Sequence, residues 1–149
     1  MTPAAMQADP LLAGLRPLLR HPPLMAGSRK VAQGGASDQR LLATFPRAAL
    51  VAPDDPTPLA RLLGAALPDP MARCWQQAAV IHLGLDGADP DGCAVRKLYL
   101  EFDSAAAPEP DLAYLALKIG RRAALHQYHL LADPADLLAG FGLPPQAAR

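Results

Sequence analysis

Four runs in the second half of the chain alternate between apolar and polar residues with a period of two. Such alternation is typical of strands that bury one face. Short segments rich in turn-forming residues separate the runs, as expected for neighbouring strands of an antiparallel meander. The runs are AAVIHLGLD (78–86), VRKLYLEF (95–102), LAYLALKI (112–119) and AALHQYHLL (123–131).

Four Asp-Pro or Thr-Pro pairs predict the starts of helices. An Asp or Thr oxygen can accept an unpaired N–H at a helix start, where proline loses no hydrogen bond. The pairs are Asp9-Pro10, Thr57-Pro58, Asp69-Pro70 and Asp133-Pro134. They predict helices over 10–20, 58–67 and 134–140, with 70–77 as a further candidate. We expect Pro17 to kink the first helix, Pro68 to stop the second, and Gly140 and Gly142 to stop the last.

The order of helices, meander and helix predicts a single α+β domain over 1–149. A four- to five-stranded antiparallel meander would carry helices packed on one face. Residues 22–37 are rich in glycine, proline and serine and predict a loop, so that 1–37 would be a peripheral helix plus loop. Residues 38–52 are compatible with a helix start in QRLLATF or a strand in RAALVA, and we favour a strand over 47–52.

The composition limits the classes of function. Fourteen basic residues balance fourteen acidic ones, so the chain lacks the basic surplus typical of nucleic-acid partners, and we expect none. No uncharged apolar run reaches the roughly 18 residues of a membrane span, and the N-terminal segment lacks the order of a signal peptide. Cys74 and Cys93 fit a reducing compartment. With a residue bias typical of GC-rich genomes, these features predict a cytoplasmic bacterial protein without a membrane span.

The alternation predicts a sheet with two chemically different faces, because successive side chains of a strand point to opposite sides. Leucine, isoleucine and phenylalanine would lie on the face that the helices cover. A three-residue loop over 120–122 would pair Leu117 with Leu125 and Tyr114 with Tyr128, which keeps apolar residues together. The opposite face would carry His82, Lys97, Tyr99, Glu101, Tyr114, Lys118, His126 and Tyr128.

This polar face is the main functional indication in the sequence. It holds three tyrosines, two histidines and two lysines, which are side chains that bind rings and anions. Tyrosine combines an apolar body with a polar tip, and lysine can hold a phosphate or pair with Glu101. The face would bind an anionic or aromatic small molecule or a partner protein, with a homodimer as one form of partnership. The alternative is an ordinary sheet face exposed to water.

Two metal-binding patterns fail on spacing. The stretch DGADPDG does not place its carboxylates in the order of a calcium loop, because the alignment puts Gly87 at the first position and Leu98 at the last. We therefore expect a hairpin turn. His126 and His129 would point to opposite faces of a strand and could not share a metal. The sequence predicts neither a metal nor a cofactor.

No catalytic residue is identified. His82, Glu101 and Tyr99 are groups that can transfer protons. The chain offers no nucleophile in a recognised turn to complete such a site, and their distances do not follow from the sequence.

The segment VIHLGLDGADPDGCAVRKLYLEF, residues 80–102, resembles a strand hairpin of the antiparallel α-β-β-α barrel prenyltransferases, in which an lGlD…rvKvYl pattern recurs. In that family, lysine, arginine and tyrosine on the inner face of the strands surround a prenyl diphosphate, and helices cover the outer face. The resemblance implies that Lys97 and Tyr99 would shield a diphosphate, with Tyr114, Lys118 and Tyr128 as companions. The family's barrel has more strands than we predict, which implies a fragment or a half-barrel that pairs.

These features predict a non-catalytic binding or accessory protein that uses the polar sheet face. The first alternative is a small prenyltransferase-like enzyme that handles a prenyl diphosphate. The second is a structural subunit of a larger assembly. A ligand site requires an enclosed face, whereas a subunit would leave an apolar patch exposed.

Overall fold

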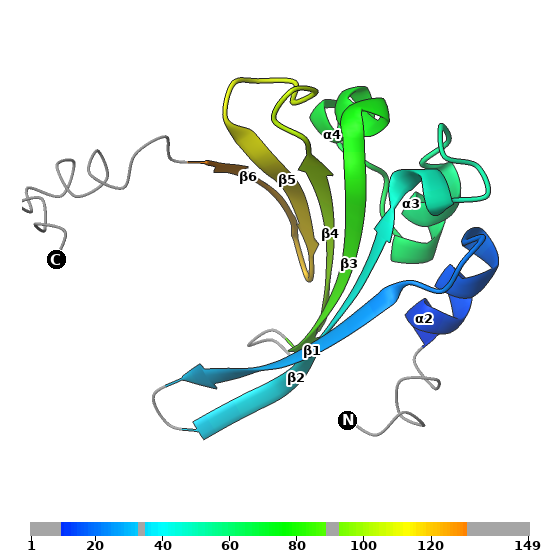
Figure 1. Ribbon diagram of the computed structural model, residues 1–149. Helices are drawn as coiled ribbons and strands as arrows, with labels where there is room; N and C mark the ends of the chain where they lie inside the picture. The colour runs from blue at the N-terminus through cyan, green and yellow to red at the C-terminus, as the bar shows by residue number, and fades with distance from the viewer. Residues whose placement is uncertain (1–9, 33–34, 89–92, 131–149) are drawn as a thin grey trace, which may run out of the picture.

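The computed structural model describes residues 10–32, 35–88 and 93–130. Their six strands form one antiparallel sheet in which each strand pairs with its neighbours in sequence, from β1 to β6. The sheet is curled, and the helices lie together on one side of it (Figure 1). The α+β meander is confirmed, with six strands instead of the expected four to five. The strands are β1 (Leu24–Ala32), β2 (Gly35–Pro46), β3 (Ala78–Ala88), β4 (Ala94–Phe102), β5 (Leu112–Ile119) and β6 (Ala123–His129).

The helices begin close to the predicted positions but are shorter than expected. Pro17 ends the first helix early, because α2 passes into a 3-10 turn there. The helix predicted over 134–140 lies outside the described residues. Within the described part of the chain, no helix is long and apolar enough to cross a membrane. The helical elements are α2 (Pro10–Leu15), η1 (Arg16–Leu18), η2 (Arg47–Ala49), α3 (Thr57–Leu63), α4 (Asp69–Cys74) and η3 (Trp75–Gln77).

The ends of α3 differ from the prediction. Thr57 is the first helical residue and makes no side-chain cap; instead its N–H donates to Asp55 Oδ1 at 2.9 Å. Hydrogen bonds from Thr57 hold the pKa of Asp55 below its ordinary value. Gly64, and not Pro68, ends the helix, because it adopts the left-handed conformation (φ 71°) in which a C-terminal carbonyl can be satisfied. Asp69 likewise makes no cap at the start of α4.

The predicted loop over 22–37 is wrong, because β1 and β2 form an antiparallel hairpin there. β2 also pairs with β3 over residues 41–46. Burial alternates over 40–45: Leu41, Ala43 and Phe45 are buried, whereas the residues between them are partly exposed. This alternation outweighs the glycine and serine content nearest the hairpin connection.

The strand favoured over 47–52 is also wrong. The chain leaves the sheet after Pro46, and η2 follows. Leu50 then forms an isolated antiparallel bridge with Leu19, which joins the segment after η2 to the segment after η1.

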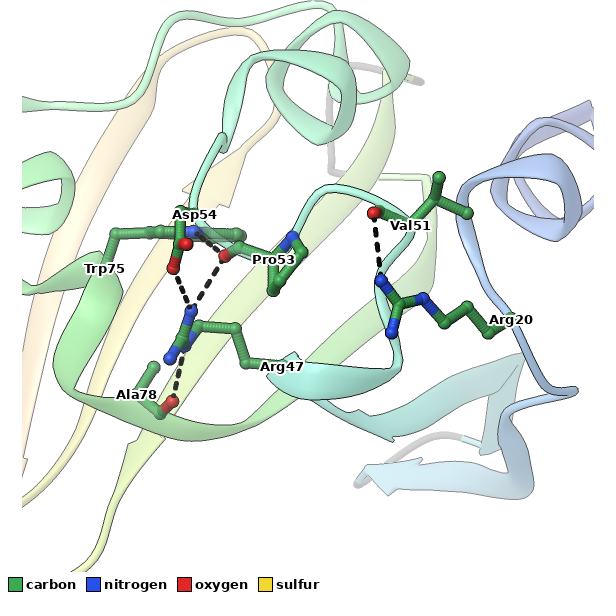
Figure 2. A network of polar contacts seen from close by, with 7 residues as sticks. All are labelled: Arg20, Arg47, Val51, Pro53, Asp54, Trp75 and Ala78. Atoms are coloured by element: carbon green, nitrogen blue, oxygen red, sulfur yellow. Dashed lines mark hydrogen bonds and ion pairs between the residues drawn. The ribbon is translucent and has the colours of Figure 1, made fainter.

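Arg47 ties this turn to the start of β3 (Figure 2). Its guanidinium donates hydrogen bonds to the carbonyl oxygens of Pro53 at 2.9 Å and Ala78 at 3.0 Å. It also pairs with the Asp54 carboxylate at 3.0 Å. The indole N–H of Trp75 donates to the same Pro53 carbonyl at 2.8 Å. Two donors from different elements thus hold the connection between η2 and α3 against the sheet.

The core lies between the helices and one face of the sheet. Gly14 in α2 permits close contact with α3, since a Cβ there would lie 2.3 Å from Leu62 Cδ1. Arg96 in β4 reaches across the core and donates to the carbonyl oxygen of Leu63 at 2.9 Å, at the C-terminal end of α3. The largest fully buried side chains are Trp75, Phe45, Leu15, Leu59, Leu63, Met71, Ile81, Leu83, Leu98, Leu100, Leu115 and Leu117.

We expect Arg47→Lys to destabilise the fold by about 1–3 kcal/mol, because an ammonium cannot serve all three oxygen partners in the same planar fork. The matched control is Arg20→Lys, whose exposed residue makes one 3.4 Å hydrogen bond to Val51 and should change stability by less than about 0.5 kcal/mol. Urea unfolding followed by Trp75 fluorescence measures both. Equal losses in the two variants would contradict the role assigned to Arg47.

Candidate functional site on the open sheet face

The side of the sheet that faces away from the helices is called the open face here. The register and the buried leucines of the opposite side place all eight residues predicted for the polar face on it. The predicted register of the last two strands is confirmed: Leu117 lies opposite Leu125, and Tyr114 opposite Tyr128. The cross-strand neighbours on the open face are His82 with Tyr99, Lys97 with Lys118, Glu101 with Tyr114, Ala116 with His126, and Tyr114 with Tyr128.

His82 is held from both sides on the open face. Its Nε2 lies 2.6 Å from Glu101 Oε2, so the ring N–H donates to the carboxylate. Its Nδ1 lies 2.9 Å from the Thr44 hydroxyl oxygen. The hydroxyl donates to Nδ1 when the ring is neutral and accepts from it when the ring is charged. Both ring nitrogens are therefore occupied, and the imidazole orientation is fixed.

Three tyrosines and this histidine form an aromatic hollow. The His82 ring centroid lies 6.4 Å from that of Tyr99 and 6.0 Å from that of Tyr114. Tyr99 and Tyr128 are also 6.4 Å apart. With Leu42 they line a hollow of about 270 Å³. Burial raises the pKa of Tyr99, and the positive charge of Lys97 offsets part of that rise.

A second, charged hollow of about 330 Å³ adjoins the first and shares Leu42 and Tyr99 with it. In it, Asp86 lies 2.5 Å from Lys97 Nζ and 3.5 Å from Arg40 Nε. Gly84 lies between Leu42 and Lys97, and the missing side chain leaves room above the strand. The remaining lining residues are Ala26, Gly27 and Leu41.

The predicted residues fall into two groups. His82, Tyr99, Glu101, Tyr114 and Tyr128 meet around the aromatic hollow, and Lys97 lines the charged hollow. Lys118 and His126 lie on the same face but are exposed towards its β6 side.

Sequence reasoning missed the contribution of β2. Arg40, Leu42 and Thr44 lie on the open face beside β3, and the segment that contains them was not predicted as a strand. Their signal was the period-two spacing of Leu41, Ala43 and Phe45, which the apolar Leu42 obscures. Asp86 lies on the same face as His82 because the two are an even number of residues apart in β3, but its pairing with Arg40 and Lys97 depends on the position of β2.

The two metal patterns have different outcomes. His126 and His129 lie in β6 opposite Ala116 and Leu112, so they point to opposite faces. Asp89 and Asp91 of the acidic turn lie outside the described residues. Among the described residues, no group of three or more His, Cys, Asp or Glu side chains could hold a metal ion.

Comparison with known proteins found no matching family model, no matching curated protein and no matching solved structure. The function proposed for this chain therefore depends on the geometry of the open face.

We expect Tyr99 to ionise above the ordinary pH range of a tyrosine, as measured by ultraviolet absorbance during an alkaline titration. Tyr99→Phe should remove this step, and Lys97→Ala should raise it further, because the lysine charge favours the phenolate. The control is Tyr128→Phe, which removes the hydroxyl of an exposed tyrosine and should leave the Tyr99 step present. Loss of that step in the control would contradict the assignment.

The same shift affects stability. The folded pKa of Tyr99 lies above its unfolded value of about 10. The contribution of this residue to the free energy of unfolding is therefore fully present below the unfolded pKa. That contribution should decrease as the pH rises through the folded pKa.

Proposed function

We propose that the open face binds a small molecule with an aromatic or planar apolar body and an anionic group. In this proposal the protein is a non-catalytic binding or accessory protein of the cytoplasm. The observation that carries the proposal is the junction of the aromatic hollow and the charged hollow at Tyr99 and Leu42. Ligand sites commonly combine an apolar concave surface with a few polar groups that fix orientation.

The aromatic hollow suits the apolar body of such a ligand. Tyr99, Tyr114 and Tyr128 come from three adjacent strands, so their rings are held at the spacing of the sheet. Rings whose centroids lie about 4.5–7 Å apart stabilise one another through offset-stacked and edge-on contacts, so they form a fixed aromatic wall against which a planar guest can pack. The centroid distances of 6.0–6.4 Å around His82 and Tyr99 fall within that range.

The charged hollow suits the anion. Arg40 and Lys97 both pair with the carboxylate of Asp86, so the described lining of the charged hollow carries more positive than negative charge. Lys97 and Lys118 are direct cross-strand neighbours, and like charges in that position repel each other. An anion between them would replace repulsion with two charge-assisted hydrogen bonds.

The spacing along β4 limits the size of the ligand. Lys97 and Tyr99 are two residues apart, which corresponds to about 6.6 Å along a strand. The anionic group would therefore lie roughly one ring away from the centre of the aromatic body. Aryl phosphates, sulfonates and carboxylates have this geometry.

His82 favours binding over catalysis in this proposal. Thr44 and Glu101 occupy both of its ring nitrogens, so neither is available to take a proton from a ligand without breaking a hydrogen bond. The histidine would instead act as a positioning residue that shapes the wall of the aromatic hollow.

Isothermal titration with three probes tests this proposal: 1-naphthyl phosphate, 1-naphthol and inorganic phosphate. We expect 1-naphthyl phosphate to bind at least tenfold more tightly than either partial probe, because only it uses both hollows. Lys97→Ala and Tyr99→Ala should each weaken its binding about tenfold, which corresponds to about 1.4 kcal/mol.

The control variant is Arg73→Ala, which removes an exposed cation from α4 on the helical side. It should leave the affinity for 1-naphthyl phosphate unchanged. Equal affinity for all three probes, or an equal loss in the control, would contradict a site on the open face.

A prenyltransferase-like enzyme is the second candidate. The observation that favours it is the placement of helices on the outer side of the sheet (Figure 1). Lys97 and Tyr99 line a hollow on the other side. This matches what the resemblance of residues 80–102 implies. Turnover would require a prenyl diphosphate and an aromatic acceptor in the same hollow.

In that case dimethylallyl diphosphate should bind the wild-type protein, and Lys97→Ala should weaken this binding at least tenfold. Fluorescence competition against 1-naphthyl phosphate measures the affinity, and release of pyrophosphate with 1-naphthol as acceptor measures turnover. Unchanged diphosphate binding in Lys97→Ala would rule this candidate out.

A further inference from the structure

We propose that two copies of this chain join edge to edge, with β1 of each copy beside β6 of its partner. The two open faces would then enclose a common interior. This inference concerns assembly and goes beyond the proposed ligand site.

The first argument is that the sheet has two free edges. In the order β1 to β6, the outer strands each have a single neighbour among the described residues. The outer side of such a strand presents unpaired N–H and C=O groups that can pair with another chain. Soluble proteins usually protect these edges with charged residues or proline. β6, with the sequence AALHQYH, contains neither an acidic residue nor lysine, arginine or proline.

The second argument is the position of the exposed apolar side chains. In the described part of the chain, the large exposed hydrophobic residues are Leu24, Val51, Tyr128 and Leu130. Leu24 begins β1, Tyr128 lies in β6 and Leu130 directly follows β6, so three of them mark the free edges. Leu24 is 77% exposed and Leu130 is 60% exposed. Because β1 and β6 run in opposite directions, these residues lie at the same end of the sheet.

The third argument is strand direction. Each neighbouring pair from β1 to β6 is antiparallel, so β1 and β6 are antiparallel to one another. A two-fold axis along the strands would therefore bring β1 against the partner's β6 in antiparallel orientation, and the second seam would be identical. Both seams continue the pattern of the sheet without a change of direction.

The fourth argument is the shape of the molecule. The sheet curls towards its open face, and the helices lie on the outer side (Figure 1). The helices therefore do not stand between the edges of two copies that face one another. Closure would bring Leu24 near the end of the partner's β6 and would cover the aromatic and charged hollows.

Sedimentation velocity over a range of protein concentrations tests the assembly. We expect a dimer of the wild-type chain. Leu24→Glu and Leu130→Lys should each weaken dimerisation at least tenfold, because each places an unpaired charge in a seam. Val51→Lys is the matched control, since it charges an exposed apolar residue outside the two edge strands, and it should remain dimeric. Circular dichroism should show the same fold in all variants.

Mixing the two edge variants tests the pairing itself. In a mixed dimer, one seam combines the introduced carboxylate on β1 with the introduced ammonium after β6, and the other seam is unchanged. We therefore expect an equimolar mixture to form dimers more strongly than either variant alone. A monomeric wild-type chain, equal dissociation of the Val51→Lys control, or no gain on mixing would overturn the proposal. A Leu24→Glu variant that remains dimeric would also overturn the proposal, because its dimer would not form through these edges.

Discussion

In the described part of the chain, helices cover one side of the sheet only, and this constraint determines which residues each strand can place towards them. The side chains that point towards the helices must be apolar, because they exclude water from the core. Those that point the other way carry no such requirement. Leu98 and Leu100 are fully buried, whereas Tyr99 between them lines a hollow on the opposite face. The core and the candidate site are therefore two sides of the same strands.

The part of the fold that the sequence predicts well is the part with strict alternation. Over residues 78–129, period-two patterning identified the strands and assigned each side chain to a face. The Gly-Arg-Arg connection also determined the register, since only a three-residue loop keeps Leu117 opposite Leu125. The composition of the aromatic hollow followed from this register, except for Leu42. The distances within it did not, because twist and curvature set them.

The remaining parts depend on long-range contacts that local patterns do not contain. Residues 38–52 were compatible with a helix start in QRLLATF or a strand in RAALVA, and β2 becomes recognisable through its pairing with β3. The turn over 47–49 is held by hydrogen bonds from Arg47 to the carbonyl oxygens of Pro53 and Ala78. Ala78 lies 31 residues further along the chain, so local sequence does not indicate this contact. The predicted end of α3 at Pro68 is wrong for a local reason, because Gly64 ends the helix earlier in the sequence.

Arg96 and Lys97 are consecutive residues of β4 that point to opposite sides of the sheet. Arg96 holds the last turn of α3 through the Leu63 carbonyl, while Lys97 pairs with Asp86 on the open face. A displacement of this peptide segment along the strand would strain both contacts together. β4 thus forms a mechanical link between the two layers. A displacement of Lys97 on the open face would therefore also displace Arg96 and its hydrogen bond to α3. Amide hydrogen exchange in α3 would measure this change.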